Sequence, residues 1–259
     1  MEVCVLASGS KGNSIFIAGG GTALLVDTGL SARELVGRLN TAGIDPASVN
    51  AVLCTHDHSD HYKGLEVFSR RYPAVRLFAN ESTAAGIEQA FPQRSFDWEI
   101  FETSSSFEIG GLRIEPFTVS HDASDPVGFL FDDGVSRLCV VTDLGQDSPV
   151  VRDKLARCHC VILESNHDPD MLMASNRVWS LKSRIAGRSG HLSNADAADL
   201  MSRVAGQELQ TLLLAHLSEE CNTCALALNT MRQALQQVGR RDVRIEVLSQ
   251  WEVSPRFVF

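Results

Sequence analysis

Three histidines and two aspartates fall within residues 55–61, Thr-His-Asp-His-Ser-Asp-His, directly after an apolar run at 51–54. Imidazole nitrogens and carboxylate oxygens are the ligands of catalytic zinc and of similar first-row ions. Without a cation, so many of these groups at one strand-to-loop junction would repel one another or remain unpaired. A solvated acidic loop is the alternative interpretation, and it leaves this density of ligand types unexplained. The heptad therefore predicts a metal site.

Further residues of ligand type follow later apolar runs. Asp27 follows 23–26, His121 comes after 113–119, Asp143 comes after 138–141, Glu164 follows 161–163 and His216 follows 211–215. A single polar residue at the end of a strand is commonplace. Five of them at the carboxyl ends of predicted strands fit one shared cleft better than chance placement.

The chain alternates short apolar runs of β type with helical stretches. Expected strands cover 3–7, 14–18, 22–27, 50–54, 76–79, 97–101, 113–119, 137–142, 160–164, 211–215 and 243–248. Expected helices cover 31–42, 149–157, 175–187, 194–205 and 220–237, the first capped by Ser31. Turn residues at 110–111 and 132–134 predict two hairpins. This order suits two sheets covered on their outer faces by helices, and we expect residues 1–259 to form a single domain.

Composition narrows the class of protein. The net charge is −9, so the chain has no overall basic footprint for nucleic acid, and such binding would need a local patch or a metal. The N-terminus has no secretory signal, and no apolar run is long enough to span a membrane. Seven cysteines without framework spacing argue for a reducing compartment, so we expect a cytoplasmic protein. The pairs Cys158/Cys160 and Cys221/Cys224 suit buried thiols better than metal ligands or redox pairs.

Five motifs, in order and at sensible spacing, resemble those of the metallo-β-lactamase superfamily of dinuclear metal hydrolases. They are Val-Asp-Thr-Gly at 26–29, His-x-His-x-Asp-His at 56–61, His121, Thr-Asp at 142–143 and Ala-His-Leu-Ser at 215–218. The resemblance implies an α/β fold, the four-layer αββα sandwich. It also implies two divalent ions, Zn²⁺ or Mn²⁺. By this resemblance one ion is bound by His56, His58 and His121, and the second ion is bound by Asp60, His61 and His216. The resemblance further implies that Asp143 bridges the two ions and that Asp27 orients a ligand histidine.

Further motifs narrow the resemblance to one branch. His58 stands where flavodiiron oxidoreductases carry an acid, and Asp143 stands where true β-lactamases of this fold usually carry cysteine. Segments 8–14, 163–168 and 189–194 resemble the bacterial YycJ/WalJ-like branch, which is related to RNase Z and associated with 5′-to-3′ DNA exonuclease activity. Glu164 and His191 match the proton-shuttling pair of RNase Z-like enzymes. The chain lacks the inserted arm that clamps transfer RNA, which argues against maturation of transfer RNA.

This constellation predicts a phosphodiesterase. Two ions would polarise a phosphoryl oxygen and lower the pKa of a shared water, giving a metal-bound hydroxide nucleophile that Asp60 orients. His191, with its imidazolium stabilised by Glu164, would protonate the leaving oxygen. The alternative for His191 is a structural position beside a glycine turn. The alternative function is hydrolysis of a small ester, thioester or cyclic phosphodiester, and a non-catalytic protein on a hydrolase scaffold is a third interpretation.

One local basic stretch suits a nucleic-acid substrate, and DNA is the substrate we expect. Arg177, Lys182, Arg184 and Arg188 precede His191, and a helix over 175–187 would place Arg177 and Arg184 on one face. Trp179 could stack on a base, or it could lie in the core beneath a solvated helix face. The glycine-rich loop 8–14 could offer N–H groups to a phosphate or form a tight structural turn. The sequence predicts no oligomeric state.

Overall fold

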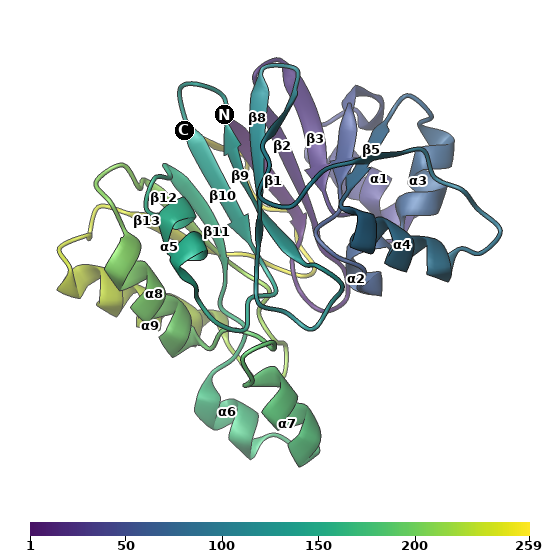
Figure 1. The fold of residues 1–259 in the computed structure, drawn as a ribbon. Helices are drawn as coiled ribbons and strands as arrows, with labels where there is room; N and C mark the ends of the chain where they lie inside the picture. The colour runs from purple at the N-terminus through teal and green to yellow at the C-terminus, as the bar shows by residue number, and fades with distance from the viewer.

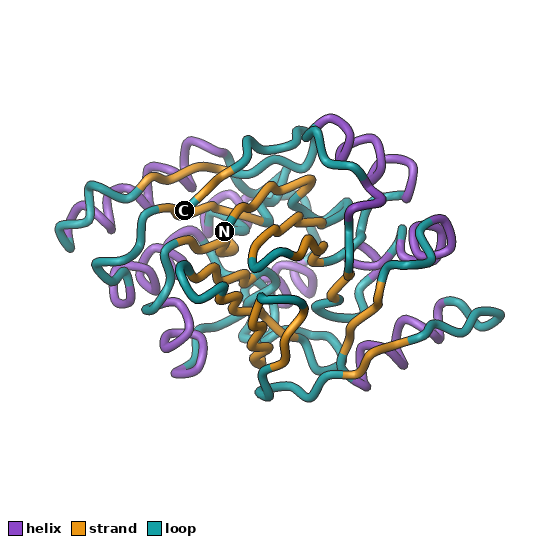
Figure 2. The backbone as a smooth tube through the Cα atoms, turned by 90° about the horizontal axis from the view of Figure 1, so that it is seen from above, coloured by secondary structure: helices purple, strands orange, loops and turns teal.

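Two seven-stranded sheets lie face to face, with helices on both outer sides (Figures 1 and 2). The computed structural model describes residues Met1–Phe259 throughout. Viewed from above, the strands occupy the middle of the molecule and the helices its flanks (Figure 2). This arrangement confirms the four-layer αββα fold expected from the sequence.

The first sheet has the strand order β14-β1-β2-β3-β4-β5-β6. Its strands are β1 (Glu2–Ala7), β2 (Ser14–Gly19), β3 (Thr22–Val26), β4 (Ala51–Leu53), β5 (Arg76–Ala79), β6 (Trp98–Ile100) and β14 (Phe257–Val258). The pairs from β14 to β3 are antiparallel, and those from β3 to β6 are parallel. The helices α1 (Ala32–Thr41), α2 (Ser59–Tyr62), α3 (Leu65–Arg71) and α4 (Glu81–Ala90) accompany this sheet.

The second sheet has the order β13-β12-β11-β10-β9-β8-β7; the pairs from β13 to β10 are parallel, and those from β10 to β7 are antiparallel. Its strands are β7 (Phe107–Ile109), β8 (Leu112–Thr118), β9 (Val127–Asp132), β10 (Arg137–Val141), β11 (Cys160–Glu164), β12 (Thr211–Ala215) and β13 (Arg244–Val247). The helices α5 (Pro149–Leu155), α8 (Asn194–Val204) and α9 (Cys224–Gln237) cover its outer face.

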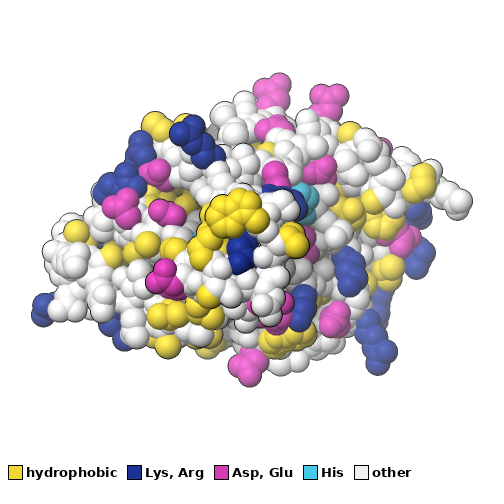
Figure 3. Space-filling model, turned by 90° about the horizontal axis from the view of Figure 1, so that it is seen from below, with side chains coloured by type: hydrophobic (Ala, Val, Ile, Leu, Met, Phe, Trp, Pro, Cys, Tyr) yellow, Lys and Arg dark blue, Asp and Glu magenta, His cyan; other side chains and the backbone are white.

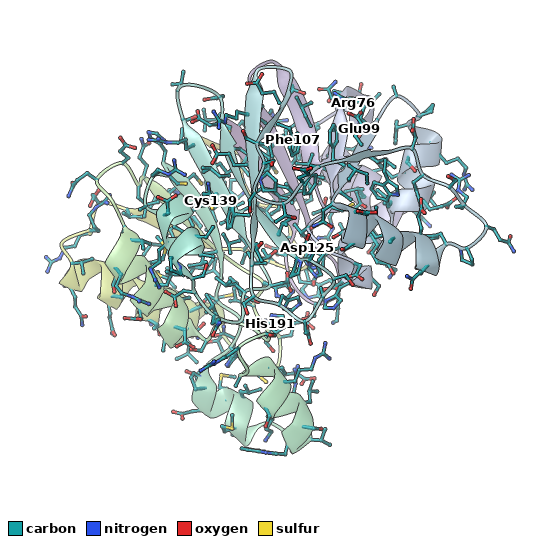
Figure 4. All side chains as sticks on the ribbon, viewed as in Figure 1. Arg76, Glu99, Phe107, Asp125, Cys139 and His191 are labelled. Carbon is teal, nitrogen blue, oxygen red and sulfur yellow. The ribbon has the colours of Figure 1, made fainter.

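Three hydrophobic cores separate the four layers. The central core lies between the sheets and includes Phe129 and Phe131, both fully buried. Phe107 extends this core by stacking on Phe78 from the first sheet and on Phe101, each at 5.4 Å between ring centroids (Figure 4). The other two cores lie between each sheet and its helices. Because each sheet is buried on both faces, its strands read as continuous apolar runs rather than as alternating ones.

Two short helices, α6 (Pro169–Ala174) and α7 (Trp179–Ile185), project from one end of the molecule as a hairpin (Figure 1). The expected single helix over 175–187 is therefore wrong. Ser175 ends α6 in an extended conformation, and Val178 begins α7. Arg177 lies in the connection, so it does not share a helical face with Arg184. The helices α2, α3, α4 and α6 and the strand β14 were not predicted from the sequence.

The cysteines are free thiols, and six of the seven are buried. Cys224 is exposed at the start of α9, so the expectation of burial is wrong for this residue. No helix of the structure combines the length and the apolar character needed to cross a membrane.

Candidate active site

The residues of ligand type gather at one end of the two sheets, where parallel strands finish. Asp27 follows β3, the heptad follows β4, Asp143 follows β10, Glu164 ends β11 and His216 follows β12. Asp27, Asp143 and His216 adopt left-handed backbone conformations, with φ of 62°, 54° and 55°. This region is uncommon for residues with a side chain and is enriched at functional sites. It turns each of these residues sharply away from the direction of its strand.

The heptad is fixed by backbone contacts with two other loops. The Asn13 N–H donates to Asp60 O at 2.8 Å, Thr28 N–H donates to His61 O at 2.7 Å, and Gly29 N–H donates to Asn13 O at 2.8 Å. Gly29 is required by this close approach, because a Cβ at this position would overlap the carbonyl oxygen of Asp60. The loops that carry the ligand-type residues are therefore bonded to one another before any ion binds.

Four overlapping groups of side chains have the separation of metal ligands, and two of them contain all the expected ligands except Asp143. The ligand atoms within each group lie within 4.8 Å of one another. Of these two, one contains His56, His58 and His121, and the other contains Asp60, His61 and His216. These are the two sets expected from the motifs.

The Asp143 carboxylate reaches both groups. Its Oδ2 lies 3.3 Å from His61 Nε2, and its Oδ1 lies 3.8 Å from His121 Nε2. Its side chain is almost completely buried, and Oδ2 has no hydrogen-bond donor. The position between the two groups suits a bridging carboxylate.

Four imidazoles use Nδ1 for the surrounding protein and turn Nε2 toward the shared centre. The Nδ1 partners are Thr55 Oγ1 for His56 (2.9 Å), Asp27 Oδ2 for His61 (2.7 Å), Gly190 O for His121 (3.1 Å) and Glu164 Oε1 for His216 (2.8 Å). Such outer partners fix the tautomer of metal-binding histidines. The Nε2 atoms of His56 and His216 are buried without any partner. Buried polar atoms are normally bonded, so these residues fit divalent cations.

Asp27 supports both groups from below the heptad. Its Oδ2 accepts from His61 Nδ1 at 2.7 Å and from Thr55 Oγ1 at 2.9 Å. Thr55 in turn lies 2.9 Å from His56 Nδ1. Asp27 therefore contacts His61 directly and His56 through a hydroxyl, and Thr55 is a site residue that the sequence analysis missed.

Asn13 is a second missed residue. Its Nδ2 lies 3.1 Å from His61 Nε2 and 3.4 Å from Asp60 Oδ2, and the residue is buried. Its Oδ1 accepts from Gly9 N–H at 2.8 Å. In the loop 8–14, the backbone N–H groups of Gly9, Lys11, Gly12 and Asn13 all donate to protein acceptors. The structural turn is therefore the better interpretation of this loop, since these donors are occupied.

Glu164 joins His191 to the second group. Its Oε1 accepts from His191 Nδ1 at 2.7 Å and from His216 Nδ1 at 2.8 Å. Its Oε2 accepts backbone N–H groups of Leu144 at 2.8 Å and Leu192 at 3.3 Å. The residue is fully buried, whereas one fifth of the His191 side chain remains exposed. His191 lies at the lower end of the sheets, directly above the α6–α7 hairpin (Figure 4). It is thus the member of this network that reaches the cleft.

The contacts of this network set its protonation. Burial favours the neutral acid, but His191 and His216 outweigh it and lower the pKa of Glu164 to about 2. Burial lowers the pKa of His191, but the Glu164 carboxylate and its hydrogen bond outweigh this effect and raise it to about 9. His191 is therefore an imidazolium beside a carboxylate, which is the form that can donate a proton.

Buried asparagines hold the segments on either side of the hairpin. Asn222 Nδ2 donates to the backbone oxygens of Ser165 and Asn166, at 2.9 and 3.0 Å, and contacts Asn194. Asn166 Nδ2 donates to His216 O at 2.8 Å. These bonds link the Glu164 strand, the start of α8 and the His216 loop. The sequence analysis did not identify them as supports of the site.

The cleft has a volume of about 230 Å³, and its walls include His58, His121, His191 and His216. Arg177 and Arg184 also line it from the hairpin, where they pair with Glu220 and Asp122. Figure 3 views this end of the molecule from below, with histidine visible beside basic and acidic side chains.

The other two basic residues of the stretch do not line the cleft. Lys182 is buried, and its Nζ donates to Met173 O at 2.6 Å, which joins α7 to the end of α6. Arg188 is exposed and is not among the residues that line the cleft. Trp179 is 71% exposed on the hairpin, so its expected alternative place in the core is wrong.

Comparisons with known proteins agree with this geometry. A family model described as the beta-lactamase superfamily domain matches residues 22–216. The chain is 36% identical over 240 residues to exodeoxyribonuclease YycJ of Bacillus anthracis, covering 92% of this chain and 90% of the relative. It is 36% identical over 236 residues to exodeoxyribonuclease WalJ of Streptococcus pneumoniae, covering 90% of this chain and 87% of the relative. The metallo-beta-lactamase fold protein YhfI of Bacillus subtilis is similar in structure, with a TM-score of 0.73 at 15% identity over 98% of each chain.

Proposed function

The chain belongs to the beta-lactamase superfamily, with the YycJ and WalJ exodeoxyribonucleases among its relatives, and we propose on this basis that it is a dinuclear-metal 5′-to-3′ DNA exonuclease. Membership confirms the resemblance expected from the motifs. The protein is a metal-dependent hydrolase of the nuclease and phosphodiesterase class. Our proposal adds the number and identity of the metal ions, the DNA substrate and the direction of cleavage.

The proposed ligands are the two groups described above together with Asp143. One ion would be held by His56, His58 and His121, and the other by Asp60, His61 and His216. Asp143 would contact both ions. All-nitrogen and oxygen ligation suits Zn²⁺ or Mn²⁺. Bound there, the ions would polarise the phosphoryl oxygen, favour ionisation of a water molecule and neutralise charge that develops in the transition state.

Asp60 is the residue placed to act on the attacking water. Its carboxylate is partly exposed at the cleft, unlike the buried carboxylates of Asp27 and Asp143. Asn13 Nδ2 lies 3.4 Å from Asp60 Oδ2, and His61 Nε2 lies 3.7 Å from it. A carboxylate held in this way can orient a water and accept its proton.

The contact between Glu164 and His191 is the observation that carries the proposal. Cleavage of a phosphodiester expels a sugar oxygen, which is a poor leaving group until it is protonated. His191 lines the cleft, and its Nδ1 is bonded to Glu164. The Glu164 carboxylate stabilises the imidazolium, so His191 can donate this proton. Hydrolysis of esters with good leaving groups would have little need for such a pair.

The hairpin supplies the proposed contacts with the substrate. Arg177 and Arg184 line the cleft, and the exposed Arg188 follows α7 in the sequence. Guanidinium groups bind phosphate oxygens in a forked geometry, so the first two suit the strand close to the cleaved phosphate. We omit Lys182 from these contacts because its ammonium is bonded inside the hairpin.

The test is a comparison of substrates with purified protein reconstituted with Mn²⁺ or Zn²⁺. The substrates are 5′- or 3′-labelled single- and double-stranded DNA, matched RNA, and bis-p-nitrophenyl phosphate. The proposal predicts early release of labelled mononucleotide from 5′-labelled DNA and gradual shortening of 3′-labelled DNA. Turnover of the small ester with intact polynucleotides would instead support the alternative of a small-ester hydrolase.

A further inference from the structure

A second hollow adjoins the candidate active site on the side of Asp60. It has a volume of about 390 Å³ and shares Ser10 and Asp60 with the cleft that contains His191. Lys11, Arg38, Lys63 and Trp251 also line it. None of these four is a proposed metal ligand, and we refer to this site as the Trp251 hollow. A molecule that extends from the cleft past Asp60 would enter it.

The cations of the Trp251 hollow suit an anionic strand. Lys63 is exposed and forms none of the ion pairs of the structure. Arg38 donates through one nitrogen to Leu6 O and Gln250 O, both at 2.8 Å, so its partners are neutral and its charge is not cancelled by them. Lys11 pairs with Glu219 at 2.6 Å. The hollow therefore contains two cations beyond its ion pair, Arg38 and Lys63. The acids that line it are Asp60 and Glu34, and the Glu34 carboxylate interacts with both cations.

Trp251 supplies a flat apolar surface in the same place. Its ring is held on one side by the Lys11 ammonium, 4.5 Å from the centroid, and its Nε1 donates to Glu219 at 2.6 Å. The residue nevertheless remains 60% exposed. A tryptophan that is fixed in orientation but open to solvent is suited to stacking on a flat partner. Cations beside an open aromatic ring are the combination that binds single-stranded nucleic acid.

We propose that the Trp251 hollow binds the nucleic-acid strand on the side of the cleaved phosphate away from His191, with a base on Trp251 and a phosphate at Lys63. This inference rests on the proposed nuclease function and adds the path of the strand. The attacking and leaving oxygens of an in-line displacement lie on opposite sides of phosphorus. His191 serves the leaving oxygen and lines only the cleft, whereas Asp60 lines both spaces. The leaving fragment is assigned to the side of His191, so the fragment that keeps the phosphate extends past Asp60 toward Trp251.

Binding is measured first without turnover. Fluorescein-labelled single-stranded DNA is titrated with protein in EDTA, and anisotropy gives Kd over a range of salt concentrations. Trp251→Ala should weaken binding by roughly 5- to 160-fold, the range expected for one stacked base. Trp251→Phe keeps an aromatic face and should stay close to wild type. Lys63→Gln should reduce the slope of log K against log salt by about 0.7, as expected for the loss of one phosphate contact to a single strand.

A matched control separates this site from a general loss of positive charge. Arg232→Gln removes one charge from an exposed residue of α9 outside both spaces, and it should leave the salt slope unchanged. For the metal-loaded enzyme, Trp251→Ala should raise KM for DNA and leave hydrolysis of bis-p-nitrophenyl phosphate unchanged. The small ester has no further nucleotide that could extend past Asp60 into the Trp251 hollow.

The outcomes distinguish this inference from the proposed function. If wild-type protein cleaves DNA while Trp251→Ala and Lys63→Gln retain its Kd, salt slope and KM, the assigned path of the strand is wrong and the nuclease function stands. Equal loss of activity on DNA and on the small ester would also overturn it, because the substitution would then act on the cleft. If wild-type protein hydrolyses only the small ester, the proposed function fails and the inference fails with it.

Discussion

His191→Ala is the substitution that most sharply separates proton donation from other roles. His191 is bonded to Glu164 at 2.7 Å, is one-fifth exposed and is not among the proposed metal ligands. General acid catalysis by a positioned side chain contributes about 10²- to 10⁴-fold to a rate. At 1.36 kcal/mol for each factor of ten, this corresponds to roughly 3–5 kcal/mol in the barrier for expulsion of a sugar oxygen.

The assay compares two leaving groups in one protein. Cleavage of a DNA oligonucleotide expels a sugar alkoxide, whereas bis-p-nitrophenyl phosphate expels a phenolate that is stable without a proton. His191→Ala should therefore slow DNA cleavage by about 10²- to 10⁴-fold and affect the small ester far less. Both kcat values are measured with saturating metal, so that altered ion binding does not enter the comparison.

His159→Ala is the control for this experiment. His159 is a partly buried histidine that precedes β11, at the opposite end of that strand from Glu164, and its Nδ1 accepts from Arg137 N–H at 3.0 Å. It should leave both rates unchanged. Equal losses on the two substrates in His191→Ala would refute the role of His191 as the general acid and would leave it a structural position.

Two further substitutions test the supports of the site. Thr55→Val keeps the side-chain shape but removes the hydroxyl between Asp27 and His56. It should lower metal affinity about 10- to 100-fold, measured by chelator competition, with little change in the cooperativity of unfolding in thermal melts. Undiminished affinity would show that this hydroxyl does not orient His56. Gly29→Ala should displace the Asp60 backbone and lower both metal affinity and melting temperature. Its control is Gly37→Ala, at a helical position where an added Cβ meets open space, which should stabilise the protein by up to about 1 kcal/mol. Similar behaviour of the two variants would contradict the close contact at Gly29.

The strands could be predicted because each is an apolar run that ends at a turn or at a polar residue. The expected bounds 76–79, 160–164 and 211–215 agree with β5, β11 and β12. Their burial on both faces makes the runs continuous, and continuous runs are easy to locate. The same regularity placed residues such as Asp143 and His216 at strand ends, and the structure brings them to one place.

The supporting residues could not be predicted in the same way. Thr55 and Asn13 act through bonds to residues distant in the sequence, and hydroxyl and amide side chains carry no periodic signal. The break between α6 and α7 depends on tertiary context, since weak helix formers such as Ser175, Asn176 and Val178 are tolerated inside many helices. That break sets the orientation of Lys182, which the sequence placed among the substrate contacts and the structure bonds to Met173 O.

The most direct test of the account is a metal titration of the stripped enzyme. Protein treated with a chelator is reconstituted with increasing Mn²⁺, and bound metal and DNA cleavage are measured on the same samples. The two ligand groups that share Asp143 predict negligible cleavage without metal and full cleavage at two ions per chain. Full activity with one ion per chain, or cleavage that persists in the stripped protein, would contradict the two-ion site.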